Sequence, residues 1–173
     1  METWQAINTV RVVRKFDDRL LAADHLDRIL NAGRRAGSSK NEQRWAFIVV
    51  QEPDHLRELA SVGPYADHLA GAAVAIALVV PAASDPLRAI SVMWDLGRAA
   101  QNMVLAAWEL GIGSCPATVY NHEIERKLLE LPDDQRCDFI LSFGYPANQA
   151  KLTAPNRPGG RKPLEAVVHE ERW

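Results

Sequence analysis

The stretch RAISVMWDLGRAAQNMVLAAWEL, residues 88–110, carries the strongest periodic signal in the sequence. Its apolar residues recur at alternating gaps of three and four, which places them along one stripe of a helix. The members of this stripe are Met93, Leu96, Ala100, Met103, Ala107 and Leu110. Alanines beside the stripe, at 99 and 106, would let a neighbouring element approach closely. The pattern predicts the central helix of the hydrophobic core.

Shorter patterns around this helix predict three more helices and three strands. We expect helices from Asp24 to near Gly37, from Pro53 to Gly63, and after a cap at Asn121. We expect strands at residues 45–51, 74–80 and 138–145, the first of them buried. Because helices outnumber strands and do not alternate with them regularly, the sequence predicts an α+β fold.

Composition and charge exclude several classes of protein. A chain of 173 residues is about one domain long. Its formal net charge of −2 gives no global attraction for nucleic acid or an anionic membrane. The first residues lack the apolar region of a secretory signal, and the longest apolar run, 69–83, falls short of the ~20 residues that cross a bilayer. We expect a cytoplasmic protein whose two cysteines, Cys115 and Cys137, are free thiols.

The composition changes after Pro146. Residues 147–163 are rich in proline and contain almost no large apolar side chain, which predicts an extended arm. The last ten residues are apolar again, with Leu164, Val167, Val168 and Trp173. Such a tail needs a surface, either on its own domain or on a second subunit. We therefore expect a single-domain protein that consists of an α+β body at residues 1–146 and a C-terminal arm at residues 147–173.

Several familiar catalytic or cofactor-binding patterns are missing. The GIGSCP stretch at 111–116 lacks the third glycine of a dinucleotide loop and follows a helix, so it favours a helix end that leads into a short strand. The five histidines have no metal-ligand spacing, and we expect most of them on the surface. Ser38 and Ser39 lie outside any nucleophile elbow. The sequence predicts neither a metal site nor a nucleophile–base pair.

Two polar features could bind a ligand. GSSKNEQRWAFIVV, residues 37–50, places short polar side chains before a strand, as an ordinary connecting loop does or as a loop facing a flat, hydrogen-bonding ligand would. Basic residues lie near both ends, at Arg11, Arg14 and Lys15 and at Arg161 and Lys162. Each basic cluster alone reads as a solvated surface. Brought together, their side chains could bind a phosphate dianion.

Three stretches resemble the nitroreductase family of flavoenzymes. RVVRKFDDRLL (11–21) resembles the pattern R-R-S-x-R-x-F, SSKNEQRWAFIVV (38–50) resembles S-S-x-N-x-Q-P-W-x-F, and GGRKPLEAVVHEERW (159–173) resembles G-R-K-P-L-E-x-V-V. AAQNMVLAAWELGIGSCPA (99–117) is similar to the family's central helix and the turn after it. The resemblance covers essentially the whole chain in the right order.

The resemblance implies a mostly antiparallel sheet surrounded by helices, in an intertwined homodimer with C-terminal arm exchange. It also implies FMN at the dimer interface and NADH or NADPH as electron donor. The implied reaction is a ping-pong hydride transfer to nitroaromatics, quinones or a related small-molecule acceptor. Because the flavin performs this chemistry, no catalytic side chain is expected.

Residue by residue, the matched motifs imply cofactor-binding positions. Arg11 would hold the phosphate, and Arg14 would lie near the pyrimidine edge of the flavin or its phosphate. Ser38, Ser39, Asn41 and Gln43 match a loop that touches the flavin held mainly by the other subunit. The backbone at Ala117 and Thr118 would lie by the reactive flavin N5. Arg161 and Lys162 would complete the phosphate site.

The chain departs from the family pattern at four positions: Val10 and Val12 replace an arginine and a serine, and Gly37 and Arg44 replace prolines. Two alternatives stay open, and Val10 and Val12 make the second of them credible. One is a specialised enzyme of the same fold, such as a dehydrogenase, a dehalogenase or a flavin-processing enzyme. The other is a flavin-binding dimer without catalytic activity.

Overall fold

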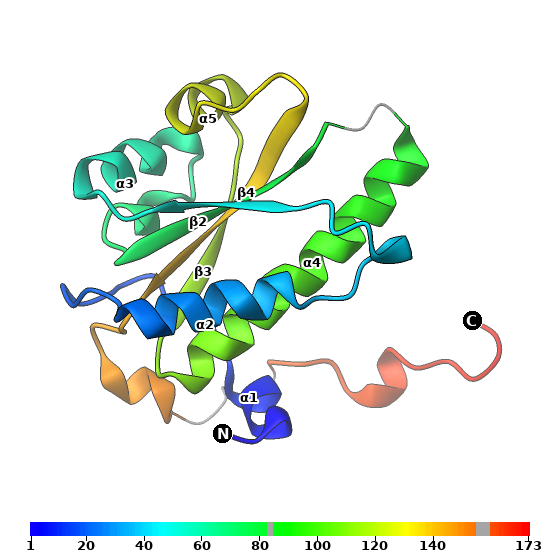
Figure 1. The fold of residues 1–173 in the computed structure, drawn as a ribbon. Helices are drawn as coiled ribbons and strands as arrows, with labels where there is room; N and C mark the ends of the chain where they lie inside the picture. The colour runs from blue at the N-terminus through cyan, green and yellow to red at the C-terminus, as the bar shows by residue number, and fades with distance from the viewer. Residues whose placement is uncertain (83–84, 155–159) are drawn as a thin grey trace.

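The computed structural model describes residues 1–82, 85–154 and 160–173 (Figure 1). Its centre is a four-stranded antiparallel sheet in the order β1-β2-β4-β3. The strands are β1 (Ala46–Val50), β2 (Val74–Pro81), β3 (Gly113–Thr118) and β4 (Gln135–Gly144). The GIGSCP stretch therefore does lead from a helix end into a short strand, as the sequence predicts.

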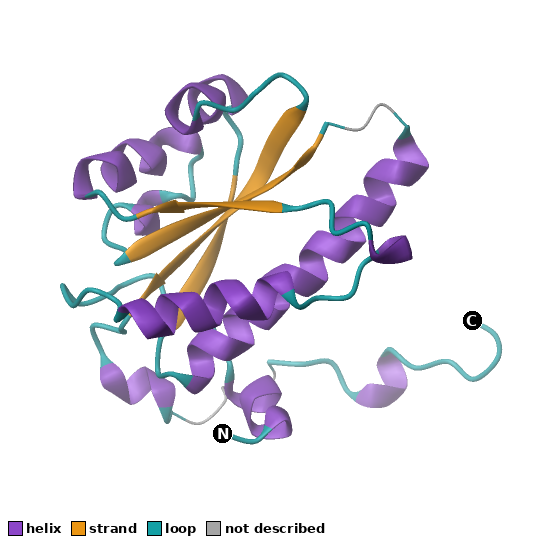
Figure 2. Ribbon diagram, in the orientation of Figure 1, coloured by secondary structure: helices purple, strands orange, loops and turns teal. Residues whose placement is uncertain are grey.

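Helices cover both faces of the sheet (Figures 1 and 2). The helices α2 (Ala23–Arg34) and α4 (Pro86–Glu109) pack on one face. On the other face lie α3 (Pro53–Leu59) and α5 (His122–Leu129), the latter capped by the Asn121 side chain, which accepts from the backbone N–H of Ile124. A short helix that the sequence did not predict, α1 (Thr3–Thr9), lies against α4. These layers confirm the α+β class.

The predicted stripe on α4 forms the centre of one core. Leu96, Met103 and Ala107 are fully buried, and the other three members of the stripe pack against the same cluster. The helix begins sharply because the Asp85 side chain accepts a hydrogen bond from the backbone N–H of Leu87 and Pro86 takes the first helical position. The periodic pattern thus identified both the helix and its buried face.

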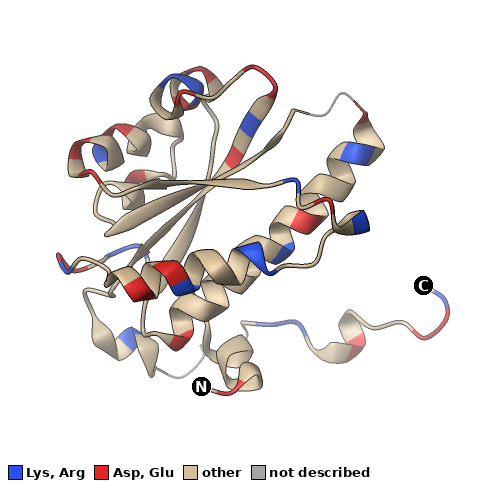
Figure 3. Ribbon diagram, in the orientation of Figure 1, with Lys and Arg blue, Asp and Glu red and all other residues tan. Residues whose placement is uncertain are grey.

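Strand β2 lies between two cores because both of its neighbours are strands and both of its faces are covered. Ile76 and Leu78 point toward α2 and α4, whereas Ala75 and Ala77 point toward α3 and α5. Figure 3 shows that charged residues occur on helices, loops and β4, and that β1, β2 and β3 carry none. The uninterrupted apolar run of β2 reflects this burial on two sides.

The prediction of a strand at 45–51 is confirmed by β1, but the prediction that this strand is buried is wrong. Strand β1 is an edge strand that pairs with β2 alone among the described strands. Val50 is buried, but Ala46 and Val49 are exposed. An apolar run shows that a segment suits a strand, but it does not show which place in the sheet the strand takes.

The segment after α1 runs along the outer edge of β3. Val12 forms a parallel bridge with Ser114, and the backbone N–H of Val13 donates to the Ser114 carbonyl at 2.9 Å. This approach requires glycine at position 113, because a Cβ there would lie 2.5 Å from the Cβ of Val13. The N-terminal segment thereby reaches the same edge of the sheet as β3.

The C-terminal tail extends away from the rest of the chain (Figure 1). Every residue from Gly160 to Trp173 is exposed, and Leu164 is 72% and Trp173 fully exposed. The tail is therefore not covered by its own domain, which was one of the two surfaces that the sequence analysis considered for it. Among the described residues, no helix is long and apolar enough to cross a membrane.

Replacing Gly113 by alanine should destabilise the protein by about 1–3 kcal/mol, because the new Cβ overlaps the buried Val13 side chain. Urea denaturation would measure the change in the free energy of unfolding. Gly71→Ala is the matched control, since a Cβ at Gly71 meets no atom within 4 Å. Equal stability of the two variants would show that the N-terminal segment does not pack on β3 in this way.

A second prediction concerns Glu125 on α5, whose side chain is only 2% exposed. Burial raises the pKa of this carboxyl, Arg126 opposes the shift and Asp138 adds to it, and together they bring the pKa from 4.5 to about 7. Since the pKa is raised on folding, the group favours the folded state most below pH 4.5, and this stability is lost as the pH rises to about 7.

The Glu125→Gln variant should therefore lose this pH dependence. Between pH 5 and pH 8, the free energy of unfolding of the parent should fall relative to that of the variant by on the order of 2 kcal/mol. Glu123→Gln, an exposed neighbour on the same helix, should behave like the parent. Parallel curves for the parent and Glu125→Gln would contradict the raised pKa.

Candidate functional site

A hollow of about 970 Å³ lies between the N-terminal segment, the C-terminal half of α4 and the edge of β3. Its size is in the range of sites that hold small molecules and cofactors. Four parts of the chain that are distant in sequence line it: residues 7–12, residues 97–104 of α4, the β3–β4 edge, and the start of the tail at Gly160 and Arg161. The hollow therefore exists only in the folded chain.

The wall that the sheet provides is largely apolar. Pro116 and Leu141 lie opposite each other in the β3–β4 ladder and both line the hollow. Ser114 lines it as well, because alternate residues of a strand share a face. From α4, the small side chains of Gly97 and Ala100 leave the space open, and Gln101 supplies an amide. Such a wall suits the apolar face of a flat ring.

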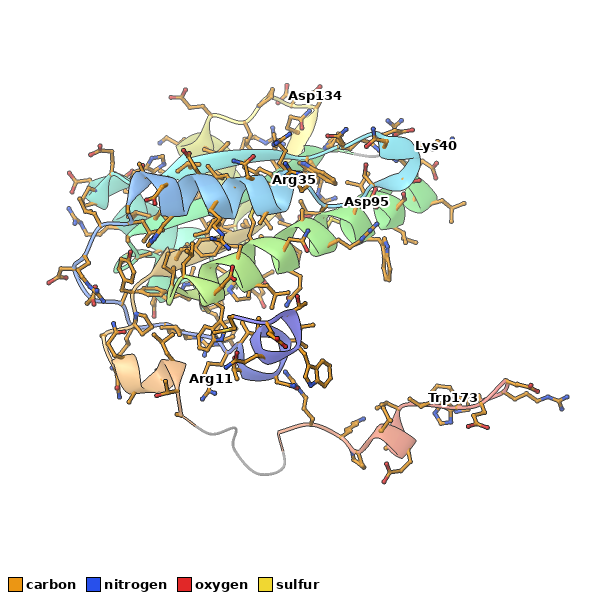
Figure 4. The ribbon with its side chains drawn as sticks, turned by 60° about the horizontal axis from the view of Figure 1, so that its bottom comes forward. Arg11, Arg35, Lys40, Asp95, Asp134 and Trp173 are labelled. Atoms are coloured by element: carbon orange, nitrogen blue, oxygen red, sulfur yellow. The ribbon has the colours of Figure 1, made fainter. Side chains whose placement is uncertain are left out.

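The two basic ends of the chain meet at this hollow. Arg11 and Arg161 both line it, although 149 positions in the sequence separate them. Arg11 donates to the Thr9 carbonyl at 3.2 Å and to the Ala154 carbonyl at 2.7 Å, so it ties the N-terminal segment to the start of the arm. Figure 4 places Arg11 between α1 and the turn at Gln149–Leu152. Lys162 is exposed and does not line the hollow.

Arg14 has a different position. Its side chain is exposed and lies outside the lining of the hollow, close to His68 and to the Cys115 thiol. Burial lowers the pKa of His68, and the charge of Arg14 lowers it further. Burial raises the pKa of Cys115, and Arg14 partly opposes that shift. A buried thiol whose pKa is raised is a poor nucleophile.

His68 is an exception to the expectation that most histidines lie on the surface. It is buried, and its Nδ1 lies 2.8 Å from the Ser142 hydroxyl. That hydroxyl donates to the Cys115 carbonyl at 3.2 Å. The network fixes β3 from the face opposite the hollow. No cluster of three metal-ligating side chains exists in the described part of the chain.

The polar loop at 38–43 borders a separate hollow of about 450 Å³, which lies beside the N-terminal half of α4. Ser38 and Ser39 line it together with three exposed apolar residues of α4, namely Leu87, Ile90 and Trp94. Asn41 and Gln43 are exposed at the tip of the loop. Within one chain, the structure therefore does not bring this loop into the first hollow.

The remaining predicted residues lie at the end of β3. Ala117 is buried toward α3 and α5. Thr118 is exposed and lies on the same face of the strand as Ser114 and Pro116. Sequence reasoning did not identify Gln101, Ser114 or Pro116 as lining residues. The similarity of residues 99–117 to a family helix and turn pointed to this region, but not to these side chains.

The geometry describes a binding site rather than an acid–base site. An apolar wall, an amide and two guanidinium groups suit a ligand with a flat ring and an anionic end. Neither an acid–base pair nor a metal cluster borders the hollow among the residues described.

Comparisons with known proteins agree with this description. A sequence model of the nitroreductase family matches residues 9–66 and 60–145. A protein of Methanothermobacter thermautotrophicus named "Putative NADH dehydrogenase/NAD(P)H nitroreductase" is 32% identical over 180 residues, which cover 100% of this chain and 88% of that protein. An "FMN reductase (NADPH)" of Bacillus subtilis is 28% identical over 190 residues, covering 99% of this chain and 74% of that protein.

A solved structure matches over nearly the full length as well. The FMN-dependent nitroreductase of Clostridium difficile R20291 superposes with a TM-score of 0.83 at 26% identity and covers 97% of this chain and 98% of that chain. Since the family match spans most of the domain and a relative above 30% identity spans the whole chain, this protein belongs to the nitroreductase family.

Proposed function

We propose that the protein is an FMN-dependent oxidoreductase that takes electrons from NADH or NADPH and passes them to a small acceptor such as a nitroaromatic compound or a quinone. Its relatives include proteins named as an NADPH-dependent FMN reductase and an FMN-dependent nitroreductase. The observation that carries the proposal is that Arg11 and Arg161, from opposite ends of the chain, both line one largely apolar hollow.

The residues present fit FMN. Two guanidinium groups can bind the phosphate dianion, and Lys162 follows Arg161 closely enough in sequence to join them. Pro116 and Leu141 offer an apolar wall to the ring system, and the Gln101 amide can hydrogen-bond its polar edge. The volume of about 970 Å³ also leaves room for a second flat molecule beside the ring.

When bound, FMN would supply the two-electron chemistry, so the chain needs no nucleophile or metal. We assign the protein three tasks. Arg11, Arg161 and Lys162 hold the phosphate. The family pattern assigns the stabilisation of negative charge at the pyrimidine edge to Arg14, although this exposed side chain lies outside the lining of the hollow. The backbone at Ala117 and Thr118 would lie along the reactive edge of the ring.

We propose a ping-pong order for the reaction. With the ring against the wall that the sheet provides, donor and acceptor would use its open face in turn. Val10 and Val12, which take the places of an arginine and a serine in the family pattern, line the same hollow and favour one alternative, a dimer that binds flavin without turnover. The experiment below separates the two.

We further propose that the active form is a homodimer in which the arm at 147–173 packs on the partner. Three exposed features support it: the apolar tail, the outer edge of β1, and the stripe of Leu87, Ile90 and Trp94 on α4. In such a dimer, the loop that carries Ser38, Ser39, Asn41 and Gln43 would reach the flavin held by the other subunit. The second hollow would then belong to the interface.

The purified protein should be yellow, and its flavin absorbance should bleach under anaerobic conditions when NADH or NADPH is added. Addition of a quinone should restore the colour. Colour that does not bleach would support the binding dimer instead, and lack of colour after FMN is supplied would contradict both functions.

Arg161→Ala should weaken FMN binding by about 10–100-fold, since a charge-assisted contact to the phosphate is lost. Arg172→Ala, which removes an equal charge later in the same tail, is the control and should bind FMN as the parent does.

A stop codon after Pro163 should abolish the dimer, because Leu164, Val167 and Val168 are then missing from the interface. Sedimentation would report monomers or aggregates that retain little FMN. A triple change to serine at the same three positions gives an independent reading with the full-length chain. A stable, flavin-loaded dimer from both variants would contradict arm exchange.

A further inference from the structure

The loop Ser38–Gln43 has an unusual backbone. Lys40, Asn41 and Gln43 all have positive φ angles, of 53°, 57° and 49°, although none is glycine. This left-handed conformation costs energy in residues that carry a Cβ, and it persists only where the surroundings fix it. Such strain is concentrated at sites where a ligand must meet a preformed surface.

Bonds within the loop fix its shape. The Ser38 hydroxyl accepts from the backbone N–H of Gln43 at 2.9 Å, and the Ser38 carbonyl accepts from the backbone N–H of Asn41 at 3.0 Å. The Gln43 amide donates to the Asn41 side chain at 3.1 Å. These contacts join loop residues to one another, so they do not determine where the loop lies on the domain.

Asp95 provides the connection to the domain. This residue lies in the middle of α4, its side chain is 5% exposed, and its Oδ2 accepts from the backbone N–H of Ser39 at 2.9 Å. In the described part of the chain, this is the hydrogen bond that joins the loop to another element. Figure 4 shows Asp95 on α4 directly below the loop that carries Lys40.

The chemistry of this contact makes it strong. A carboxylate removed from water is unfavourable unless it is hydrogen-bonded, and a bond from a backbone N–H to an ionised carboxylate is among the stronger kinds. The adjacent Arg98 lies over Gly37, where a Cβ would meet its guanidinium at 2.6 Å. Side chains from two successive turns of α4 therefore lie against the residues that precede and begin the loop.

We propose that Asp95 is a positioning residue that holds the Ser38–Gln43 loop in place so that it can complete the flavin site of the partner subunit. This inference rests on the proposed function. Asp95 does not touch the cofactor in this scheme; it acts through the Ser39 backbone. A loop that is already held in its binding conformation loses less conformational entropy when the ligand binds, and this increases the affinity.

The test compares Asp95→Ala, Asp95→Asn and the parent, all as full-length chains. The asparagine keeps an oxygen that can accept from Ser39 but loses the charge, so it should rescue part of the function. Glu123→Ala removes an exposed acid from α5 and serves as the control. Two quantities are measured: amide hydrogen exchange of residues 37–44 in flavin-free protein, and the FMN dissociation constant.

We expect faster exchange at residues 37–44 in Asp95→Ala and FMN binding weakened by about 10–100-fold, with Asp95→Asn intermediate and Glu123→Ala unchanged. If exchange increases but FMN affinity equals that of the parent, Asp95 is only structural and the proposal is overturned. Unchanged exchange in both Asp95 variants also overturns it.

The two hypotheses can fail separately. If the parent itself binds no FMN, the proposed function is wrong, whereas faster exchange confined to residues 37–44 would still support the anchoring of the loop by Asp95. Should Asp95→Ala fail to fold, Asp95→Asn decides the question by the same two measurements.

Discussion

The burial of one face of α4 is the constraint on which the other features depend. Leu96, Met103 and Ala107 must face the sheet, which turns the opposite side of the same helix outward along its whole length. That outward side borders both hollows: Gly97 and Gln101 lie beside the first, and the large apolar residues at 87, 90 and 94 lie beside the second. A single rigid helix therefore sets how the proposed cofactor site and the proposed interface are spaced.

Periodicity predicted the parts of the fold whose burial it encodes directly. The stripe of α4 and the helix capped by Asn121 were identified because their apolar residues repeat at helical spacing, and the central strand β2 was identified from its short continuous apolar run. Strand β1 was placed in the core, since a run of β-branched and aromatic residues describes a strand without giving its place in the sheet. Helix α1 was not predicted, because its seven residues make only about two turns, which is too few for a helical repeat of apolar residues to be recognised.

The site was less accessible to local reasoning. The basic residues at both ends were noticed, but their meeting depends on the close approach of Val13 to Gly113, which no local pattern reveals. The family resemblance supplied the idea of convergence, and the structure brings Arg11 and Arg161 together while it leaves Arg14 and the Ser38–Gln43 loop elsewhere. Asp95 was overlooked because an acid within an amphipathic helix reads as solvent-facing, and only the fold shows it buried beneath a loop.

The open edge of β1 has a consequence for a chain that has just been synthesised. Among the described strands, Ala46–Val50 pairs on one side only, so the backbone groups on its other side can form hydrogen bonds with an extended segment of another chain. The same molecule also exposes an apolar C-terminal tail. In the proposed homodimer these surfaces are covered only after two chains have met, so a newly made chain can either dimerise or aggregate, and exposed apolar surface favours aggregation. Protomer concentration would then govern yield as well as stability.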